Sequence, residues 1–446
     1  MAKAIKIKKG LNISIKGSPE DKTTIVSNSS LYAVKPTDFP SLIPKMVVKV
    51  GEKVKVGTPI FFDKYRESIQ YVSPVSGEVA EIKRGEKRKI LEVIIKADSE
   101  FQFESFDTSG DTKEVLLKSG LWSCIQQRPL AIVANPAESP KAIFVTGFDS
   151  SPLAPKYEYV LRGKQKELQA GFDTLAKLTE GKVNVTIEAA DKNAGVFSQL
   201  TGIELNTIVG KHPAGNVGTQ IHHINPINKG EVVWTLNAID VATIGNFFLT
   251  GKLDFTKHIA LTGSEVESPS YYTMWRGASI SEVIKGNIKS ENNRYISGNV
   301  LTGENIGENG FLGAYDNQIT VIPEGNQFKF SLTEGWMTPG LKKLSNSKLF
   351  LSSLFSKKKF DVDTNTYGEE RAFVLSGQYE EVFPFDIMPV QLIKAAIVND
   401  IDAMEKLGIY EVAPEDFALC EFVCTSKINS QNIIRESLKV IQDECM

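Results

Sequence analysis

The chain has 446 residues, with 51 Lys and Arg against 54 Asp and Glu, which gives a formal net charge of −3 at pH 7. A chain of this length is expected to form about three to four domains. Its balanced charge gives no support for nucleic-acid binding through bulk electrostatics. Basic residues cluster only at 2–9, 83–89 and 357–359. Each cluster is either solvated surface or a docking patch for an acidic partner or an anionic membrane.

No apolar run reaches the ~18–20 residues that span a bilayer. The nearest stretch, 232–249, contains Asn237 and Asp240 and predicts a buried strand followed by a helix. The N-terminal residues lack the apolar run of a signal peptide. Four irregularly spaced cysteines fit a reducing compartment. We therefore expect a cytoplasmic chain with no transmembrane helix.

Residues 1–105 are predicted to be all β. Alternating apolar residues and two glycines at 50–61, followed by SPVSGEV at 73–79, resemble the two halves of a biotinyl/lipoyl-type barrel-sandwich module. In carrier modules the hairpin between the halves presents a lysine in a motif such as MKM. This hairpin reads DKYRES, at 63–68, so the carrier lysine motif is absent. Lys64 is then either structural or a modified carrier lysine.

Residues 113–255 are predicted to form a Rossmann-like α/β domain. The run 141–147 predicts a buried strand, the spacing in 165–178 an amphipathic helix, and 183–187 the next strand. This order indicates a parallel βαβ unit. The chain contains neither G-x-G-x-x-G nor GxxxxGK[ST], so such a topology would lack its phosphate cradle.

Residues 256–330 resemble the ubiquitin-like β-grasp module called SLBB, because a strand that ends at Gly263 precedes a short helix at 278–284. Residues 331–446 are predicted to form an irregular connection followed by a helical domain. Its helices are expected at 390–400 and 401–407, with Pro389 at the first helical position and with Gly408 at the end of the second helix. The predicted fold class is therefore multidomain α+β.

The segment KHPAGNVGTQIHHINP, at 211–226, holds three of the four histidines. His212, His222 and His223 could supply imidazoles to a metal. However, the adjacent side chains of His222 and His223 usually point to opposite sides, and no carboxylate or Cys lies nearby in the sequence. The alternatives are a loop that shapes a cofactor or partner pocket and a structural turn.

Two cysteines, Cys420 and Cys424, stand four apart on a predicted helix. They could ligate an iron–sulfur cluster, but such a cluster needs four thiolates. The alternative is that both are small apolar residues buried in a core.

Five longer segments appear in the same order as the modules: LIPKMVVKVGEKVKVGTPIF, PKAIFVTGFDSSPLAPK, the histidine-rich segment, VVWTLNAIDVATIGNFFLTGKLDF and IALTGSEVESPSYYTMWRGASISEVI. Together they resemble the family of the A subunit of the bacterial sodium-translocating NADH:quinone oxidoreductase, over nearly the whole chain. The family often has His where this chain has Gln220. This family is similar to the flavoprotein subunit of respiratory complex I and to a subunit of ferredoxin:NAD oxidoreductase that carries iron–sulfur clusters.

The resemblance implies a peripheral subunit on the cytoplasmic side of the membrane, with no tightly bound cofactor of its own. Its partners would be the membrane subunits of a complex that oxidises NADH, reduces ubiquinone and moves sodium outward. Flavins and a 2Fe–2S centre would lie in the other subunits, and the isolated chain would show no turnover.

A quinone headgroup needs an apolar slot with a few hydrogen-bond donors. Within the matched segments the predicted quinone-binding residues are His212, His222 and His223, with Trp336 of the irregular connection as an apolar wall. Two other functions stay open. One is a purely structural adaptor of the complex, and the other is an independent soluble flavin- or NADH-dependent oxidoreductase.

Overall fold

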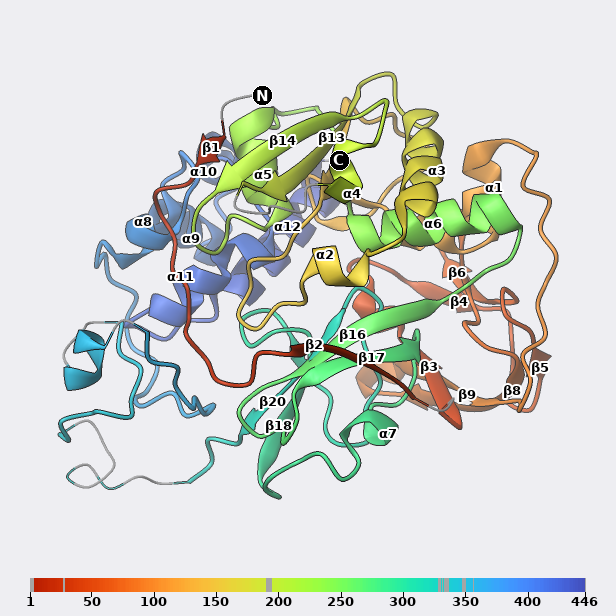
Figure 1. Ribbon diagram of the computed structural model, residues 1–446. Coiled ribbons are helices and arrows are strands. Elements are labelled where there is room, and N and C mark those ends of the chain that lie inside the picture. The colour runs from red at the N-terminus through yellow and green to blue at the C-terminus, as the bar shows by residue number, and fades with distance from the viewer. Residues whose placement is uncertain are drawn as a thin grey trace.

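The computed structural model describes residues 4–26, 29–189, 195–327, 330, 332, 337–346, 350–355 and 357–445. A seven-stranded sheet with its helices forms the upper part of the molecule in Figure 1, and a six-stranded sheet lies below it. Two smaller sheets lie on the right, and the C-terminal helices on the left. Across the described residues, no helix has the length and apolarity needed to cross a membrane.

The seven-stranded sheet has a parallel centre and an antiparallel edge. Its strands, in spatial order, are β1 (Ile5–Lys6), β14 (Glu204–Val209), β13 (Lys182–Glu188), β12 (Ala142–Thr146), β15 (Val233–Asn237), β10 (Gln126–Arg128) and β11 (Ile132–Val133). The predicted parallel β12–helix–β13 unit is confirmed, with Ile143 opposite Val183.

Helices cover both faces of this sheet because successive strand side chains point to opposite sides. Ile143 and Val145 of β12 belong to the main core, together with apolar residues of α3 (Gln165–Ala176) and α6 (Ala238–Thr250). Ala142 and Phe144 pack instead with Ile221 of α5 (Val217–Ile224). Three shorter helices complete the domain: α1 (Thr112–Lys118), α2 (Tyr157–Val160) and α4 (Gly195–Ser198).

The N-terminal module consists of two packed antiparallel sheets. One holds β3 (Leu31–Val34), β9 (Ile90–Ala97), β8 (Gly77–Arg84) and β5 (Lys53–Val54), and the other holds β4 (Pro44–Met46), β6 (Pro59–Asp63) and β7 (Arg66–Val72). Lys64 is exposed in the β6–β7 hairpin. The Arg66 guanidinium pairs with Asp63 and donates to the Val133 carbonyl oxygen at 2.9 Å, so the hairpin is fixed to the α/β domain.

Two strands predicted for the N-terminal module join other sheets instead. β1 pairs with β14 at the edge of the seven-stranded sheet, and β2 (Glu20–Ile25) pairs with β17. The physical reason is that a local sequence pattern can indicate a strand but does not identify its hydrogen-bonding partner. The first strand of the two packed sheets is therefore β3, and the preceding chain links the other domains.

The six-stranded sheet forms the β-grasp region, with the short helix α7 (Ser281–Ile284) beside it. Its strands, in spatial order, are β19 (Glu304–Asn305), β18 (Asn293–Ser297), β20 (Gln318–Pro323), β16 (Thr256–Thr262), β17 (Ser270–Trp275) and β2. Tyr271 belongs to a strand here, and the predicted helix at 278–284 shortens to its second half.

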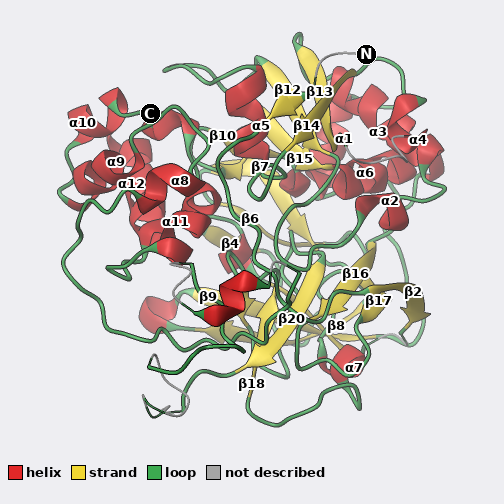
Figure 2. Cartoon of the chain, turned by 60° about the vertical axis from the view of Figure 1, so that its left-hand side comes forward, coloured by secondary structure: helices red, strands yellow, loops and turns green. Residues whose placement is uncertain are grey.

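The C-terminal helices gather around a separate apolar core, at the left of Figure 2. They are α8 (Gln378–Val382), α9 (Pro389–Ile397), α10 (Ile401–Lys406), α11 (Ala418–Val423) and α12 (Ser430–Cys445). Pro389 begins α9 and Gly408, at φ +90°, follows the end of α10, as predicted. Cys420 and Cys424 are buried free thiols in this core.

Candidate functional site

The strand order of the seven-stranded sheet reverses between β12 and β15. From β12 the chain builds outward through β13 and β14, and it then returns to place β15 on the other side of β12. Ligands of open α/β sheets bind in the crevice outside the carboxyl ends of the strands at such a switch point. A cavity of about 430 Å³ lies here, lined by residues that end or follow these two strands, including Thr146, Phe148, Leu236 and Asn237.

Four parts of the chain contribute walls to this cavity. The N-terminal module supplies Pro40, the β-grasp region supplies Tyr315, and the C-terminal helical region supplies Pro414 and Arg435. The α/β domain supplies most of the remainder, including His212. The lining is mixed and mostly polar, with charged side chains such as Arg128, Asp240 and Arg435 beside aromatic and aliphatic residues such as Phe148 and Leu236.

His212 is 4% exposed and is held by two polar contacts. Its Nδ1 lies 3.0 Å from the Ser150 hydroxyl oxygen, and its backbone N–H donates to Asn12 Oδ1 at 2.8 Å. Burial lowers the pKa of the imidazole to about 4, against a smaller opposing effect from a hydrogen bond to Ser150. The ring is therefore neutral at physiological pH and lies at the cavity wall as an uncharged polar group.

His222 has a different role. Its Nε2 accepts the Asp386 backbone N–H at 3.0 Å, so Nδ1 carries the proton and donates to Glu411 Oε2 at 2.8 Å. Its ring also packs on Phe385, at a centroid distance of 4.9 Å. Both nitrogens are thus used to join α5 to the C-terminal helical region.

His223 is exposed on the same helix, where its Nδ1 contacts the Thr219 carbonyl oxygen at 2.9 Å. Burial of part of its ring lowers its pKa. Among the described residues that line the cavity, His212 is the one histidine. The fourth predicted residue, Trp336, lies outside the described residues. No described group of three or more His, Cys, Asp or Glu residues is arranged to hold a metal ion.

Two glycines of the histidine-rich segment let other parts of the protein pack directly against its backbone. A Cβ on Gly215 would lie 2.5 Å from the Ser150 backbone nitrogen. A Cβ on Gly218 would lie 2.4 Å from Arg128 Nη1 and 2.6 Å from Asp416 Oδ1. The tight packing of the segment also positions His212 at the cavity wall.

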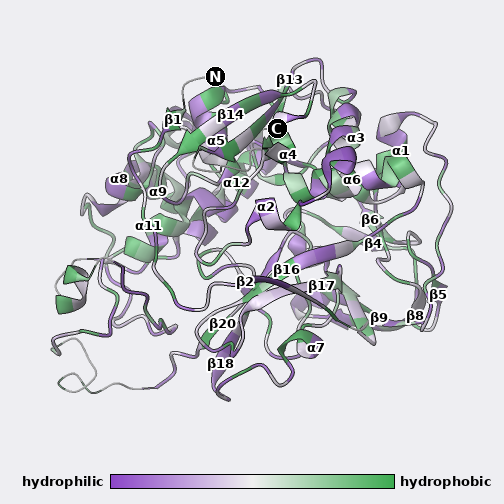
Figure 3. Ribbon diagram, in the orientation of Figure 1, coloured by the Kyte–Doolittle hydropathy of each residue, from purple (hydrophilic) through white to green (hydrophobic). Residues whose placement is uncertain are grey.

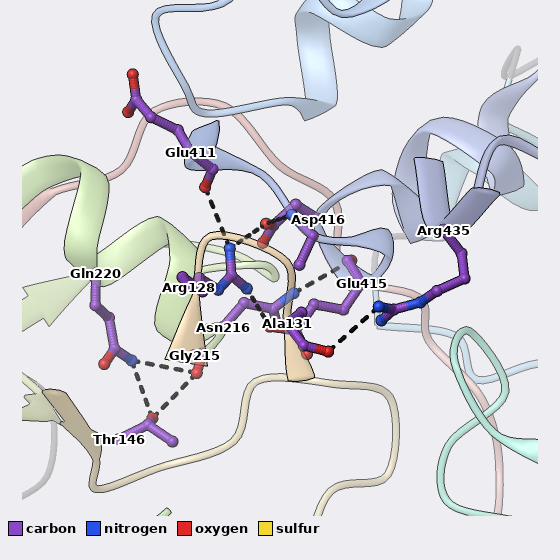
Figure 4. A network of polar contacts seen from close by, with 11 residues as sticks. Arg128, Ala131, Thr146, Gly215, Asn216, Gln220, Glu411, Glu415, Asp416 and Arg435 are labelled. Carbon is purple, nitrogen blue, oxygen red and sulfur yellow. Dashed lines mark hydrogen bonds and ion pairs between the residues drawn. The ribbon is translucent and has the colours of Figure 1, made fainter. Parts of the chain in front are cut away.

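Arg128 connects the α/β domain to the C-terminal helical region (Figure 4). It is 2% exposed, and its guanidinium pairs with Asp416 and with Glu415, each at 2.6 Å. Arg435 approaches from α12 and donates to the carbonyl oxygens of Leu130 and Ala131. The two arginines thus fix one wall of the cavity by crossing between domains.

Gln220 is completely buried beneath the cavity. Its amide nitrogen donates to Thr146 Oγ1 at 3.0 Å and to the Gly215 carbonyl oxygen at 3.2 Å, as Figure 4 shows. The side chain therefore holds the end of β12 against the loop that carries His212. Its Oε1 has no protein partner among the described residues.

Two further polar residues of the cavity, Asp149 and Tyr157, were not among the residues predicted for the site. Burial raises the pKa of the Asp149 carboxyl, although the Ser151 backbone N–H donates to it at 2.7 Å. Burial and the negative charge of Asp149 raise the pKa of Tyr157 well above its usual value. The signal that could have found Asp149 is its position shortly after the buried parallel strand β12, where ligand-binding residues gather, whereas Tyr157 begins α2 and carries no such signal.

Comparison with known proteins identifies all three modules. Residues 5–98 match the model of the NqrA N-terminal barrel-sandwich hybrid domain, residues 108–253 that of the NqrA second alpha/beta domain, and residues 258–307 that of the NQRA C-terminal domain. These matches define the chain as a protein with a barrel-sandwich domain, an α/β domain and an SLBB-type domain.

The A subunit of Na(+)-translocating NADH-quinone reductase from Saccharophagus degradans is 37% identical, with 99% of this chain and 100% of the relative covered. Its namesake from Pseudomonas aeruginosa strain UCBPP-PA14 is also 37% identical, with the same coverage. The chain belongs to this family, the A subunits of Na(+)-translocating NADH-quinone reductase. An NAD+-reducing [NiFe]-hydrogenase chain aligns over 68% of this chain and 56% of its own at 10% identity, but the TM-score of 0.34 is too low to support a shared fold.

Proposed function

We propose that this chain is a peripheral subunit on the cytoplasmic side of a membrane complex that oxidises NADH, reduces ubiquinone and pumps sodium ions out of the cytoplasm. Support comes from relatives that match essentially its whole length and are named for Na(+) translocation and NADH-quinone reduction. Its partners are the other subunits of that complex. The isolated chain has no turnover, because the electrons for the quinone come from those partners.

The chain contributes quinone binding through the cavity between β12 and β15. The observation that carries this proposal is the neutral, buried His212 at the wall of a cavity of about 430 Å³ with a mixed apolar and polar lining. A quinone ring is flat and carries two carbonyl oxygens, so it can pack on the aromatic and aliphatic lining residues, such as Phe148 and Leu236, while neutral polar side chains donate to its oxygens. A neutral imidazole suits such a ligand better than a charged one would.

Quinone reduction takes up protons as well as electrons. Asp149 and Tyr157 line the same cavity, and burial raises the pKa of both groups. Burial therefore shifts Asp149 toward its protonated form, the form that passes a proton to a reduced quinone, whereas the raised pKa of Tyr157 makes it a hydrogen-bond donor rather than a proton donor.

The chain holds no tightly bound cofactor of its own, and flavins and a 2Fe–2S centre belong to its partners. The absence of both G-x-G-x-x-G and GxxxxGK[ST] from the sequence supports this proposal. A purified chain without visible flavin absorbance, beside a complex that contains flavin, is the expected result. Flavin retained by the isolated chain would contradict it.

The quinone proposal is tested by measuring how tightly a water-soluble ubiquinone analogue binds to the purified chain and to two variants. His212→Ala removes a polar group from the cavity wall and should weaken binding about tenfold, the effect of one lost hydrogen bond. The matched control, His223→Ala, changes an exposed histidine of the same segment and should bind like the parent.

A correctly folded His212→Ala chain with unchanged affinity would refute this placement. If the parent itself shows no binding while it still assembles with the membrane subunits, the chain is a structural adaptor. Thermal unfolding curves of each variant separate a loss of the site from a loss of the fold.

A further inference from the structure

One part of the surface has no role in the proposed cavity, and it contains the basic cluster at 357–359. We call this part the apolar-basic arm, and we define it as the described residues 337–346, 350–355 and 357–360. It lies between β20 and the C-terminal helices, at the left-hand edge of Figure 1. The cavity proposal does not depend on it.

Large apolar side chains of the arm are exposed to an unusual degree. Leu354 is 77% exposed and Phe355 is 56% exposed, at the end of a short 3₁₀ helix, Leu351–Leu354. Met337, Leu341 and Leu351 are also about half exposed. Figure 3 shows this helix as a hydrophobic segment that protrudes from the body. Several large apolar side chains exposed in one segment are typical of an interaction surface.

The arm carries one sign of charge. Its described residues include five lysines, at positions 342, 343, 357, 358 and 359, and no Asp or Glu. Lys342 and Lys357 are exposed. Leucine and phenylalanine beside lysine are the composition of segments that lie in the headgroup region of a membrane. The positive charge is complementary to anionic lipids.

The arm is held in place although it protrudes. Leu351 N–H donates to the Pro339 carbonyl oxygen at 3.1 Å, which folds the arm on itself. At its far end Phe360 exchanges backbone hydrogen bonds with Ser14 and Lys16. The exposed side chains therefore belong to a folded projection that is attached to the body at Phe360.

We infer that the apolar-basic arm binds the surface of an anionic lipid bilayer, with Leu354 and Phe355 inserted among the headgroups and the lysines on lipid phosphates. The inference goes beyond the proposed function, because it concerns direct lipid contact rather than the quinone site or attachment to partner subunits. Each lysine close to an anionic surface strengthens binding by about fivefold. Insertion of the Leu354 and Phe355 side chains supplies the rest of the binding free energy.

The experiment is co-sedimentation of the purified full-length chain with vesicles of phosphatidylcholine, with and without phosphatidylglycerol. The parent should bind the anionic vesicles, and binding should fall as salt is raised. The variant L354S/F355S should bind at least tenfold more weakly. The variant K342Q/K357Q should lose binding to anionic vesicles while it keeps its weak binding to neutral ones.

The matched control is I397S/V398S, which removes two exposed apolar side chains at the end of α9, 50% and 70% exposed, and should bind like the parent. Equal binding of L354S/F355S and the parent would overturn the inference. It is also overturned if the parent ignores both kinds of vesicle while L354S/F355S no longer co-purifies with the membrane subunits, since the arm would then dock on protein. Failure of the cavity proposal leaves every one of these outcomes unchanged.

Discussion

Arg128 should be the most sensitive single position at the junction between the α/β domain and the C-terminal helical region. The proposed perturbation is Arg128→Met, which keeps much of the side-chain volume and removes the charge. In the native chain this guanidinium pairs with Asp416 and Glu415 and also donates to the Glu411 carbonyl oxygen. The variant leaves the acidic partners without their cation.

The two partners contribute unequally. The Asp416 side chain is fully buried, whereas that of Glu415 is 45% exposed and is screened by water. Removing one member of a buried pair costs about 3–5 kcal/mol, and an exposed pair contributes about 0–1 kcal/mol. We therefore expect Arg128→Met to lower the free energy of unfolding by about 3 kcal/mol, almost all of it from the stranded Asp416.

A double-mutant cycle isolates this pair. Asp416→Asn keeps an oxygen that can accept the Ala413 N–H, as Asp416 Oδ2 does at 2.8 Å, but it removes the negative charge. The double variant R128M/D416N should then be more stable than R128M alone, because no buried charge is left unpaired. A chain of several domains need not unfold in one step. The free energy of unfolding of each variant is therefore taken from the first transition in urea denaturation of the full chain.

The reasoning is refuted if the two changes are additive to within about 0.5 kcal/mol, which is the behaviour of sites that do not interact. It is also refuted if R128M alone is as stable as the parent. Either result would mean that the pair contributes nothing to the junction.

Two further predictions concern the histidine-rich segment. Because the pKa of His212 falls to about 4 in the folded state, against about 6.5 when unfolded, the unfolded chain binds more protons between these pH values. Stability should therefore be lost as the pH falls below about 6.5, by about 2 kcal/mol at pH 5, and His212→Gln should reduce this loss in urea denaturation at pH 5 and 7. Gly218→Ala should cost about 1–3 kcal/mol because its Cβ meets Arg128 and Asp416, whereas Gly195→Ala, whose Cβ would meet no described atom within 4 Å, should not.

Much of the fold could be predicted from the sequence because its signals are local. The apolar run before Gly147 identified β12, and the three-and-four spacing of residues such as Leu168 and Phe172 identified α3. Pro389 and Gly408 marked helix ends through their own backbone preferences. In each case the residues that determine the element lie within it.

Strand partners and site contacts could not be predicted in this way. β2 lies within the stretch predicted to be all β, but its neighbour β17 lies far along the chain. His222 contacts Glu411 and Asp386, which also lie far along the chain, and these two contacts, rather than any property of the segment 211–226, occupy both ring nitrogens. Arg128 carries no motif at all, and its importance arises from burial beside two carboxylates of another domain.

The contacts of Arg128 and of His222 also bear on how a cavity shared by several domains keeps its shape. Both side chains join the α/β domain to the C-terminal helical region, through Glu411 in each case and through Glu415 and Asp416 for Arg128. Arg128 and Glu415 are themselves part of the cavity wall. A movement of the helical region away from β12 would therefore open the cavity and break both ties together. Ligand affinity and stability of the junction should consequently fall together in R128M, whereas His212→Ala should reduce affinity while the junction stays intact.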